Sequence, residues 1–150
     1  MNKNRGLMKI YMVERKLYLL GVPIIPKVIK TFIRVIFSAT ISYKTEIGNG
    51  TLFPHGGQGV VIHEEARIGG NCIIQSNVVI GGRNGMLGAP IIGDNVLVGA
   101  GAVILGKITI GNNVAIGANS VVTKDIPDNA VVVGIPGRIS RFLSGSEKIK

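Results

Sequence analysis

The chain has 150 residues, 46% of them hydrophobic, which is enough for one compact domain and short for two. Its 22 glycines are about twice the usual share of roughly 7%, but there is no collagen period, which excludes a collagen-like chain. The formal net charge is +9, yet no stretch reaches the ~18 apolar residues of a membrane span, and the charged first residues argue against a signal peptide.

The N-terminal part of the chain is basic and has helical periodicity. Residues 1–44 contain nine lysines and arginines but a single acidic residue, Glu14, so they carry a net charge of +8. Apolar residues recur three and four positions apart over 7–20 and 26–37, with a Gly-Val-Pro turn between them. This pattern predicts a helical segment over residues 1–38.

Two interpretations of this basic segment are open. An amphipathic helix of this kind either packs on its own domain with a solvated basic face, or lies on an anionic membrane surface or a partner. The protein is then expected to be cytoplasmic in the first case and membrane-peripheral in the second. Nucleic acid is not expected as a partner, because no basic motif with interleaved aromatic residues is present.

After Thr40 the apolar residues follow a period of six. The frame is clearest in the units that begin at Ile92, Val98, Ile110 and Ile116, where glycine follows the aliphatic residue. Branched aliphatic or apolar residues hold the frame at positions 41, 47, 53, 62, 68, 74, 80, 92, 98, 104, 110, 116 and 122. Because this period fits neither a helix nor a plain strand, each unit must combine a short strand with a turn. We expect a solenoid of stacked parallel coils over 39–141 and a tail over 142–150.

The only cysteine, Cys72, is predicted to be a core residue. It lies four residues after Ile68, a place that Val96, Ala102 and Val114 take in other units. A single cysteine cannot form an internal disulfide, which favours a reducing, cytoplasmic compartment.

Two irregular segments interrupt the six-residue frame. The first contains His55 among the glycines between Phe53 and Ile62, and such a loop lets a ligand approach the backbone closely. The second, residues 81–90, is a glycine-rich excursion that either walls a binding site or is a bare insertion. The other histidine, His63, follows Ile62 and is expected to project near a corner.

Several stretches resemble one known family. They are His55-Gly56, Ile80-Gly81-Gly82, 98–102, 116–120 and 134–138. They are similar to the hexapeptide-repeat acyltransferases, above all to serine acetyltransferases and related polysaccharide O-acetyltransferases. The resemblance implies a left-handed parallel β-helix, all-β after the helical segment, usually a homotrimer with active sites between subunits. The hand comes from the resemblance alone, because parallel strands generally connect right-handedly.

The resemblance implies transfer of acetyl from acetyl-CoA to a hydroxyl group, with His55 as the general base. By this resemblance the acceptor is expected to be L-serine, or alternatively a sugar or surface polysaccharide, with His63 and Glu64 on the acceptor side. The residues expected to contact coenzyme A are Gly82, Ala100 and Ala118 at the pantetheine, Lys124 and Arg138 toward the phosphates, and Arg83. No metal is expected.

The acceptor side departs from serine acetyltransferases. Thr40 stands where the family has the aspartate that orients the catalytic histidine, and Pro54 and Ala89 replace a further aspartate and a histidine. Glu64, Glu65 or a backbone carbonyl could orient the ring instead. A non-catalytic scaffold and a metal-dependent hydratase are the alternatives of another class, although two histidines supply a zinc site poorly.

Overall fold

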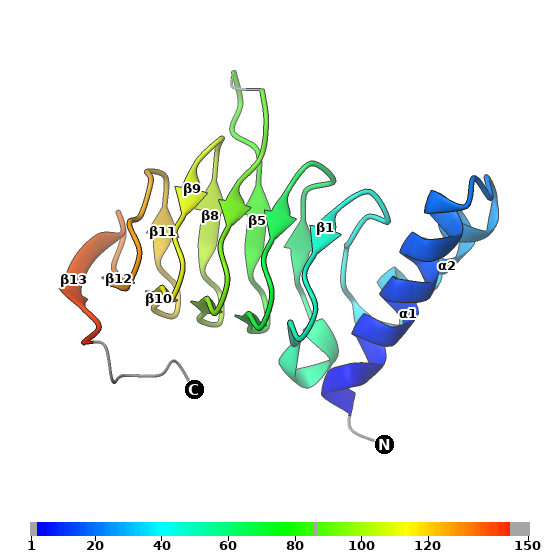
Figure 1. Ribbon diagram of the computed structural model, residues 1–150, viewed down its shortest axis with the longest axis horizontal. Helices are drawn as coiled ribbons and strands as arrows, with labels where there is room; N and C mark the ends of the chain where they lie inside the picture. The colour runs from blue at the N-terminus through cyan, green and yellow to red at the C-terminus, as the bar shows by residue number, and fades with distance from the viewer. Residues whose placement is uncertain (1–2, 86, 145–150) are drawn as a thin grey trace.

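The computed structural model describes residues 3–85 and 87–144. Two helices, α1 (Lys3–Leu19) and α2 (Ile25–Phe37), lie side by side at one end of a solenoid of short strands (Figure 1). They match the two predicted helices, with α1 beginning earlier than expected. Pro26 lies in the first turn of α2, where its missing N–H breaks no helical hydrogen bond. The predicted tail, 142–150, lies outside the described residues from position 145 onward.

The strands form three sheets that run the length of the solenoid. Sheet A contains β2 (Val61–Ile62), β5 (Val79–Gly81), β8 (Val103–Leu105) and β11 (Val121–Val122). Sheet B contains β1 (Glu46–Ile47), β3 (Arg67–Ile68), β6 (Ile91–Ile92) and β9 (Thr109–Ile110). Sheet C contains β4 (Ile73–Ile74), β7 (Leu97–Val98), β10 (Ala115–Ile116), β12 (Ala130–Val133) and β13 (Arg138–Phe142). All pairings between these strands are parallel except β12 with β13.

The core confirms the predicted frame. All thirteen positions of the six-residue frame are buried, from Ile41 at one end to Val122 at the other. Residues four places later are mostly buried as well, including Cys72, which is a free cysteine inside the prism as predicted. Burial raises the pKa of the Cys72 thiol. Each coil therefore stacks its apolar residues on equivalent residues of the next coil, so the core is a continuous column.

The turns explain the asparagines and glycines of the frame. Asn71, Asn77, Asn95, Asn113 and Asn119 all have φ between 55° and 59°, the left-handed conformation that asparagine tolerates better than most residues. Glycine takes the same place at position 101, where φ is 71° and an added methyl group would lie 2.2 Å from Asn119 Oδ1. A tight left-handed corner in each unit thus selects these two residue types.

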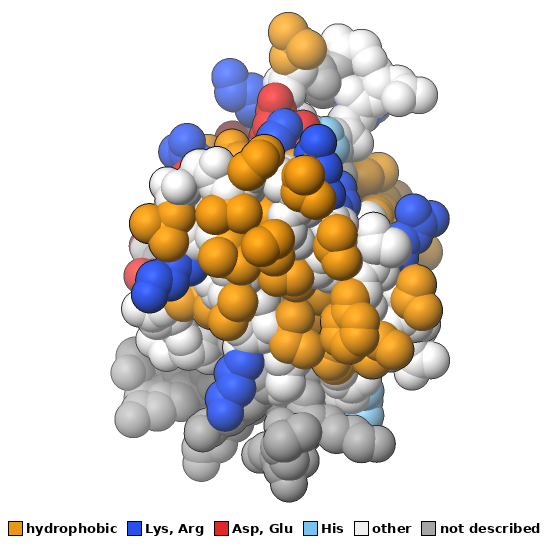
Figure 2. All heavy atoms as spheres, turned by 90° about the vertical axis from the view of Figure 1, so that its right-hand side faces the viewer, with side chains coloured by type: hydrophobic (Ala, Val, Ile, Leu, Met, Phe, Trp, Pro, Cys, Tyr) orange, Lys and Arg blue, Asp and Glu red, His pale blue; other side chains and the backbone are white. Residues whose placement is uncertain are grey.

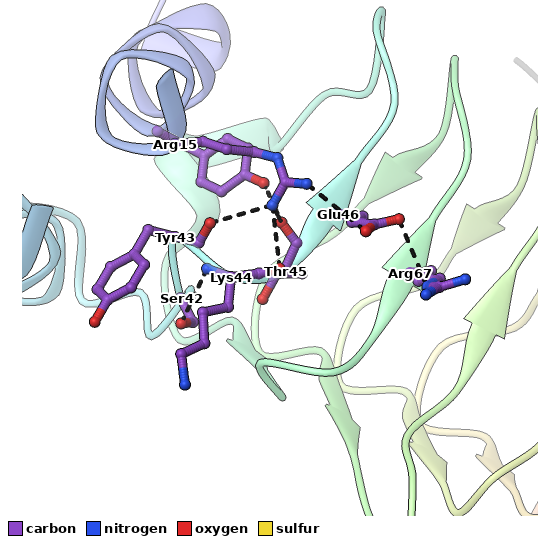
Figure 3. A network of polar contacts seen from close by, with 8 residues as sticks. Arg15, Ser42, Tyr43, Lys44, Thr45, Glu46 and Arg67 are labelled. Atoms are coloured by element: carbon purple, nitrogen blue, oxygen red, sulfur yellow. Dashed lines mark hydrogen bonds and ion pairs between the residues drawn. The ribbon is translucent and has the colours of Figure 1, made fainter. Parts of the chain in front are cut away.

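Polar contacts attach the helices to the first coil (Figure 3). Arg15 Nη1 donates hydrogen bonds to the carbonyl oxygens of Tyr43 at 3.2 Å, Lys44 at 3.1 Å and Thr45 at 2.6 Å. The Tyr11 hydroxyl donates to the same Thr45 carbonyl at 2.5 Å. The helices therefore cover the end of the solenoid, which would otherwise expose unpaired strand edges. Neither they nor any other helix among the described residues is long and apolar enough to cross a membrane.

Candidate active site

Apart from Arg138, the candidate residues lie on two different corners of the prism. Corner CA, between sheets C and A, contains residues 54–60, 75–78, 99–102 and 117–120. Corner AB, between sheets A and B, contains 42–45, 63–66, the loop residues 82–85 and 87–90, 106–108 and 123–125. In Figure 1 this loop projects from one edge of the solenoid, while the short helix η1 (Pro54–Gly57) lies at the opposite edge beside α1.

His55 is exposed and held in an unusual backbone conformation. Its φ of 57° lies in the left-handed region, and Gly56 and Gly57 follow with φ of 74° and 72°. A left-handed residue other than glycine or asparagine typically costs about 1–3 kcal/mol and persists only where the surroundings impose it. Such strain is concentrated at functional sites, so the conformation supports the choice of His55 over a histidine in an ordinary loop.

The N-terminal helices hold the His55 loop in place. A methyl group added at Gly57 would lie 2.5 Å from Leu7 Cδ2 of α1, and one at Gly56 would lie 3.2 Å from Phe37 Cδ1 of α2. Leu7 and Phe53 are fully buried beneath the loop. Sequence reasoning did not identify Leu7 and Phe37 as supports of the site, because no local pattern reveals a contact across so many residues.

Within the described part of the chain, the His55 ring has no hydrogen-bond partner. Thr40, at the place of the family aspartate, is tied into sheet A through its backbone: its N–H donates to the Val60 carbonyl at 2.8 Å. Glu64 pairs with Lys44 Nζ at 3.2 Å on corner AB, and this hydrogen bond raises the pKa of Lys44. Neither side chain therefore orients His55 within one chain.

Corner CA brings Ala100 and Ala118 onto the same edge as His55. Backbone hydrogen bonds of 2.9 Å link its successive turns, from Asn77 N to Gln58 O, from Gly101 N to Ser76 O, and from Asn119 N to Ala100 O. Ala100 and Ala118 are both exposed. Small side chains along this edge leave the backbone accessible to a thin, extended ligand.

Corner AB gathers the other candidates. His63 Nδ1 accepts a hydrogen bond from the Glu65 N–H at 3.2 Å, and a methyl group at Gly82 would lie 3.9 Å from His63 Nε2. A methyl group at Gly106 would lie 3.7 Å from Arg83 Cβ, so the loop begins beside the next coil. Lys124 is exposed farther along this corner. Within one chain, this group does not meet His55.

Two further placements complete the site. Arg138 is exposed on β13 at the C-terminal end, where its Nη1 donates to the Gly137 carbonyl at 3.1 Å. The loop lies against the aliphatic part of Lys107, since a methyl group at Gly88 would lie 3.2 Å from its Cγ and Cδ. Among residues 3–85 and 87–144, no group of three or more His, Cys, Asp or Glu side chains could hold a metal ion.

Known proteins are similar to this chain in sequence and fold. Residues 89–124 match the family model for the bacterial transferase hexapeptide (six repeats). Serine acetyltransferase of Synechococcus elongatus is 42% identical over 125 residues, which are 82% of this chain and 51% of that protein. The chain thus spans about half the length of the curated relatives it matches.

Solved structures agree with this resemblance. Brucella abortus serine acetyltransferase in complex with coenzyme A has a TM-score of 0.90 and 32% identity, covering 96% of this chain and 58% of that one. The Neisseria gonorrhoeae enzyme in complex with serine has a TM-score of 0.85 and 35% identity, covering 92% of this chain and 57% of that one. The predicted fold is confirmed: the chain is a hexapeptide-repeat protein with a left-handed parallel β-helix, similar to the serine acetyltransferases over most of its own length.

Proposed function

We propose that the protein transfers the acetyl group of acetyl-CoA to a hydroxyl group, with L-serine as the acceptor. The observation that carries this proposal is the extended similarity to serine acetyltransferases, which spans 82% of the chain at 42% identity. A relative with coenzyme A bound and one with serine bound have similar folds over 96% and 92% of this chain, respectively.

His55 is the proposed general base. As the acceptor oxygen attacks the thioester carbonyl, the imidazole takes the hydroxyl proton. The tetrahedral intermediate then collapses, the carbon–sulfur bond breaks, and the imidazolium returns the proton to the coenzyme A thiolate. The exposure and the enforced conformation of His55 support this role, because a base must reach substrate without rearranging its loop.

We further propose that coenzyme A lies along corner CA, with Ala100 and Ala118 beside the pantetheine. Gly82, Arg83 and Lys124 of corner AB, with His63 and Glu64 on the acceptor side, then belong to the neighbouring copy of a homotrimer. Arg138 is proposed to contact a phosphate. This arrangement accounts for candidate residues that lie on two corners of one chain.

The outer faces of the solenoid support such an assembly. Sheets A and C present apolar side chains outward, at Val79, Val103 and Val121 in sheet A and at Ile73, Leu97, Ala115 and Val131 in sheet C. Sheet B instead presents Glu46, Arg67, Ile91 and Thr109, all exposed. Two apolar faces and one largely polar face fit packing of copies around an axis.

A sugar or surface polysaccharide is the second candidate acceptor. Three departures favour it: Thr40, Pro54 and Ala89 stand where serine acetyltransferases carry polar groups near the acceptor. A non-catalytic scaffold remains the alternative of another class. The single buried cysteine favours a reducing, cytoplasmic location.

Release of coenzyme A from acetyl-CoA tests these proposals, with L-serine and a panel of sugars as acceptors. His55→Ala should lower the rate at least roughly 100-fold, the low end of what a general base contributes. Thr109→Ala is the control, because it truncates an exposed side chain on the outer face of sheet B, outside both corners. If only sugars stimulate the release of coenzyme A, the acceptor is a sugar and not serine. If the protein does not bind coenzyme A saturably, the result favours a non-catalytic scaffold.

A further inference from the structure

The outward side of the helix pair is apolar. While Leu7, Tyr11 and Ile33 are buried on the solenoid side, the opposite side of the helices faces solvent. Six large apolar side chains there are between 59% and 71% exposed: Leu19, Leu20, Ile24, Val28, Val35 and Ile36. Figure 2, which faces this end of the molecule, shows hydrophobic side chains across most of its surface. We call this surface the end face; contiguous apolar patches of this kind mark interaction sites.

The end face is also basic. Lys9 and Lys16, seven residues apart, are exposed on one line of α1, between Met12 on one side and Val13 on the other. Lys27 and Arg34, also seven apart, are exposed on α2. Within the described parts of both helices the single acidic residue is Glu14, and it is buried. Cations on the end face therefore have no exposed carboxylate of these helices beside them.

Charge decides which partner fits. Two copies that met through their end faces would bring together segments of net charge +8 each, and this repulsion opposes the apolar contact. An anionic lipid surface offers both an apolar layer and negative charge. Its acyl boundary accepts the aliphatic side chains, while long lysine and arginine side chains reach the phosphates. Cytoplasmic leaflets that contain anionic lipid attract each such cation.

We propose that the end face binds the surface of an anionic membrane, with the helix pair lying at the lipid headgroups. The helix pair lies at one end of the solenoid, and the strands of the three sheets extend away from it (Figure 1). The proposal does not depend on acetyl transfer, because it rests on α1, α2 and the turn between them.

Flotation with lipid vesicles tests this proposal. The full chain should float with phosphatidylcholine vesicles that contain about 30% phosphatidylserine, and much less with phosphatidylcholine alone. Val35→Glu, at a side chain 71% exposed, should weaken binding at least about tenfold, since it replaces apolar burial by a repelled charge. Replacing Lys9 and Lys16 by glutamine should weaken binding about fivefold for each lysine.

Ile135→Glu is the matched control, because Ile135 is 73% exposed at the other end of the solenoid and receives the same charge change. It should bind vesicles like the wild type. The proposal is overturned if the wild type does not bind the anionic vesicles, or if Ile135→Glu weakens binding as much as Val35→Glu. Light scattering in which Val35→Glu lowers the molar mass, without vesicle binding by the wild type, would instead assign the end face to a second copy.

Discussion

Glu14 has a buried carboxyl group, and the charged form of this group should destabilise the folded protein. Its side chain is completely buried in α1, and neither carboxylate oxygen has a hydrogen-bond partner in the described structure. Burial raises the pKa of Glu14 from 4.5 to about 7, against a smaller opposing effect of the Lys30 charge. An unpaired buried carboxylate favours its protonated form in the folded state.

The sign and size of the effect follow from this shift. Because the folded state holds the proton more tightly than the unfolded chain, stability is complete below about pH 4.5 and is lost as the pH rises through 7. The shift corresponds to about 3 kcal/mol at 1.36 kcal/mol for each pH unit. Glu14→Gln removes the charge at nearly constant shape. Above pH 7 the variant should therefore be more stable by up to about 3 kcal/mol, or roughly 6–12 °C in Tm.

Urea unfolding followed by circular dichroism at about pH 5 and about pH 8 measures this difference. The advantage of Glu14→Gln should be small at the lower pH and appear at the higher one. Glu65→Gln, at an exposed carboxylate, is the control and should change stability little at either pH. An advantage of Glu14→Gln that is equal at both pH values would refute the reasoning, since a titrating charge must act through pH.

Three further predictions concern the loop, the helix contacts and the core. Gly57→Ala should lower both Tm and the rate of coenzyme A release, because the added methyl group would lie 2.5 Å from Leu7 Cδ2. Gly21→Ala is the control, since Gly21 has a similar φ of 77° but no heavy atom within 4 Å of an added methyl group. It should lower Tm less and leave the rate unchanged. Arg15→Ala should lower the free energy of unfolding in urea by about 2–4 kcal/mol, because the guanidinium donates to three carbonyls. Arg67→Ala removes only an exposed ion pair and should lower it by under about 1 kcal/mol. Equal losses of unfolding free energy in the two variants would contradict this account. Cys72 should react with a thiol reagent only after unfolding, since its sulfur is buried and its pKa raised, and rapid labelling of the native protein would show that the first coils open.

Much of the fold is predictable because it repeats. A period of six requires a strand and a turn in each unit, and every predicted core position, from Ile41 to Val122, is buried. Cys72 could be placed in the core for the same reason. The helices were predicted from their own periodicity, and they end at Leu19 and Phe37. These features depend on residues within one or two repeat units of one another, so a local sequence pattern is enough to predict them.

The tertiary structure alone decided how the candidate residues group. His55 and His63 are eight positions apart, yet they lie on different corners, because the chain passes through a whole strand of sheet A between them. The support of the His55 loop by Leu7 and Phe37 joins segments far apart in sequence. Such contacts follow from how the helices dock, which no spacing within either segment specifies.

Apolar periodicity is sufficient to predict the coils, their core and the two helices. Which side of each helix faces solvent depends instead on how the helices dock. Apolar residues occur nearly all round α1 and on a wide side of α2 that includes both Ile33 and Val35, so Leu7 and Ile33 could not be told from Val13 and Val35 by type. Docking on the first coil buried the first pair and left the second exposed, because each helix can turn only one side toward the solenoid.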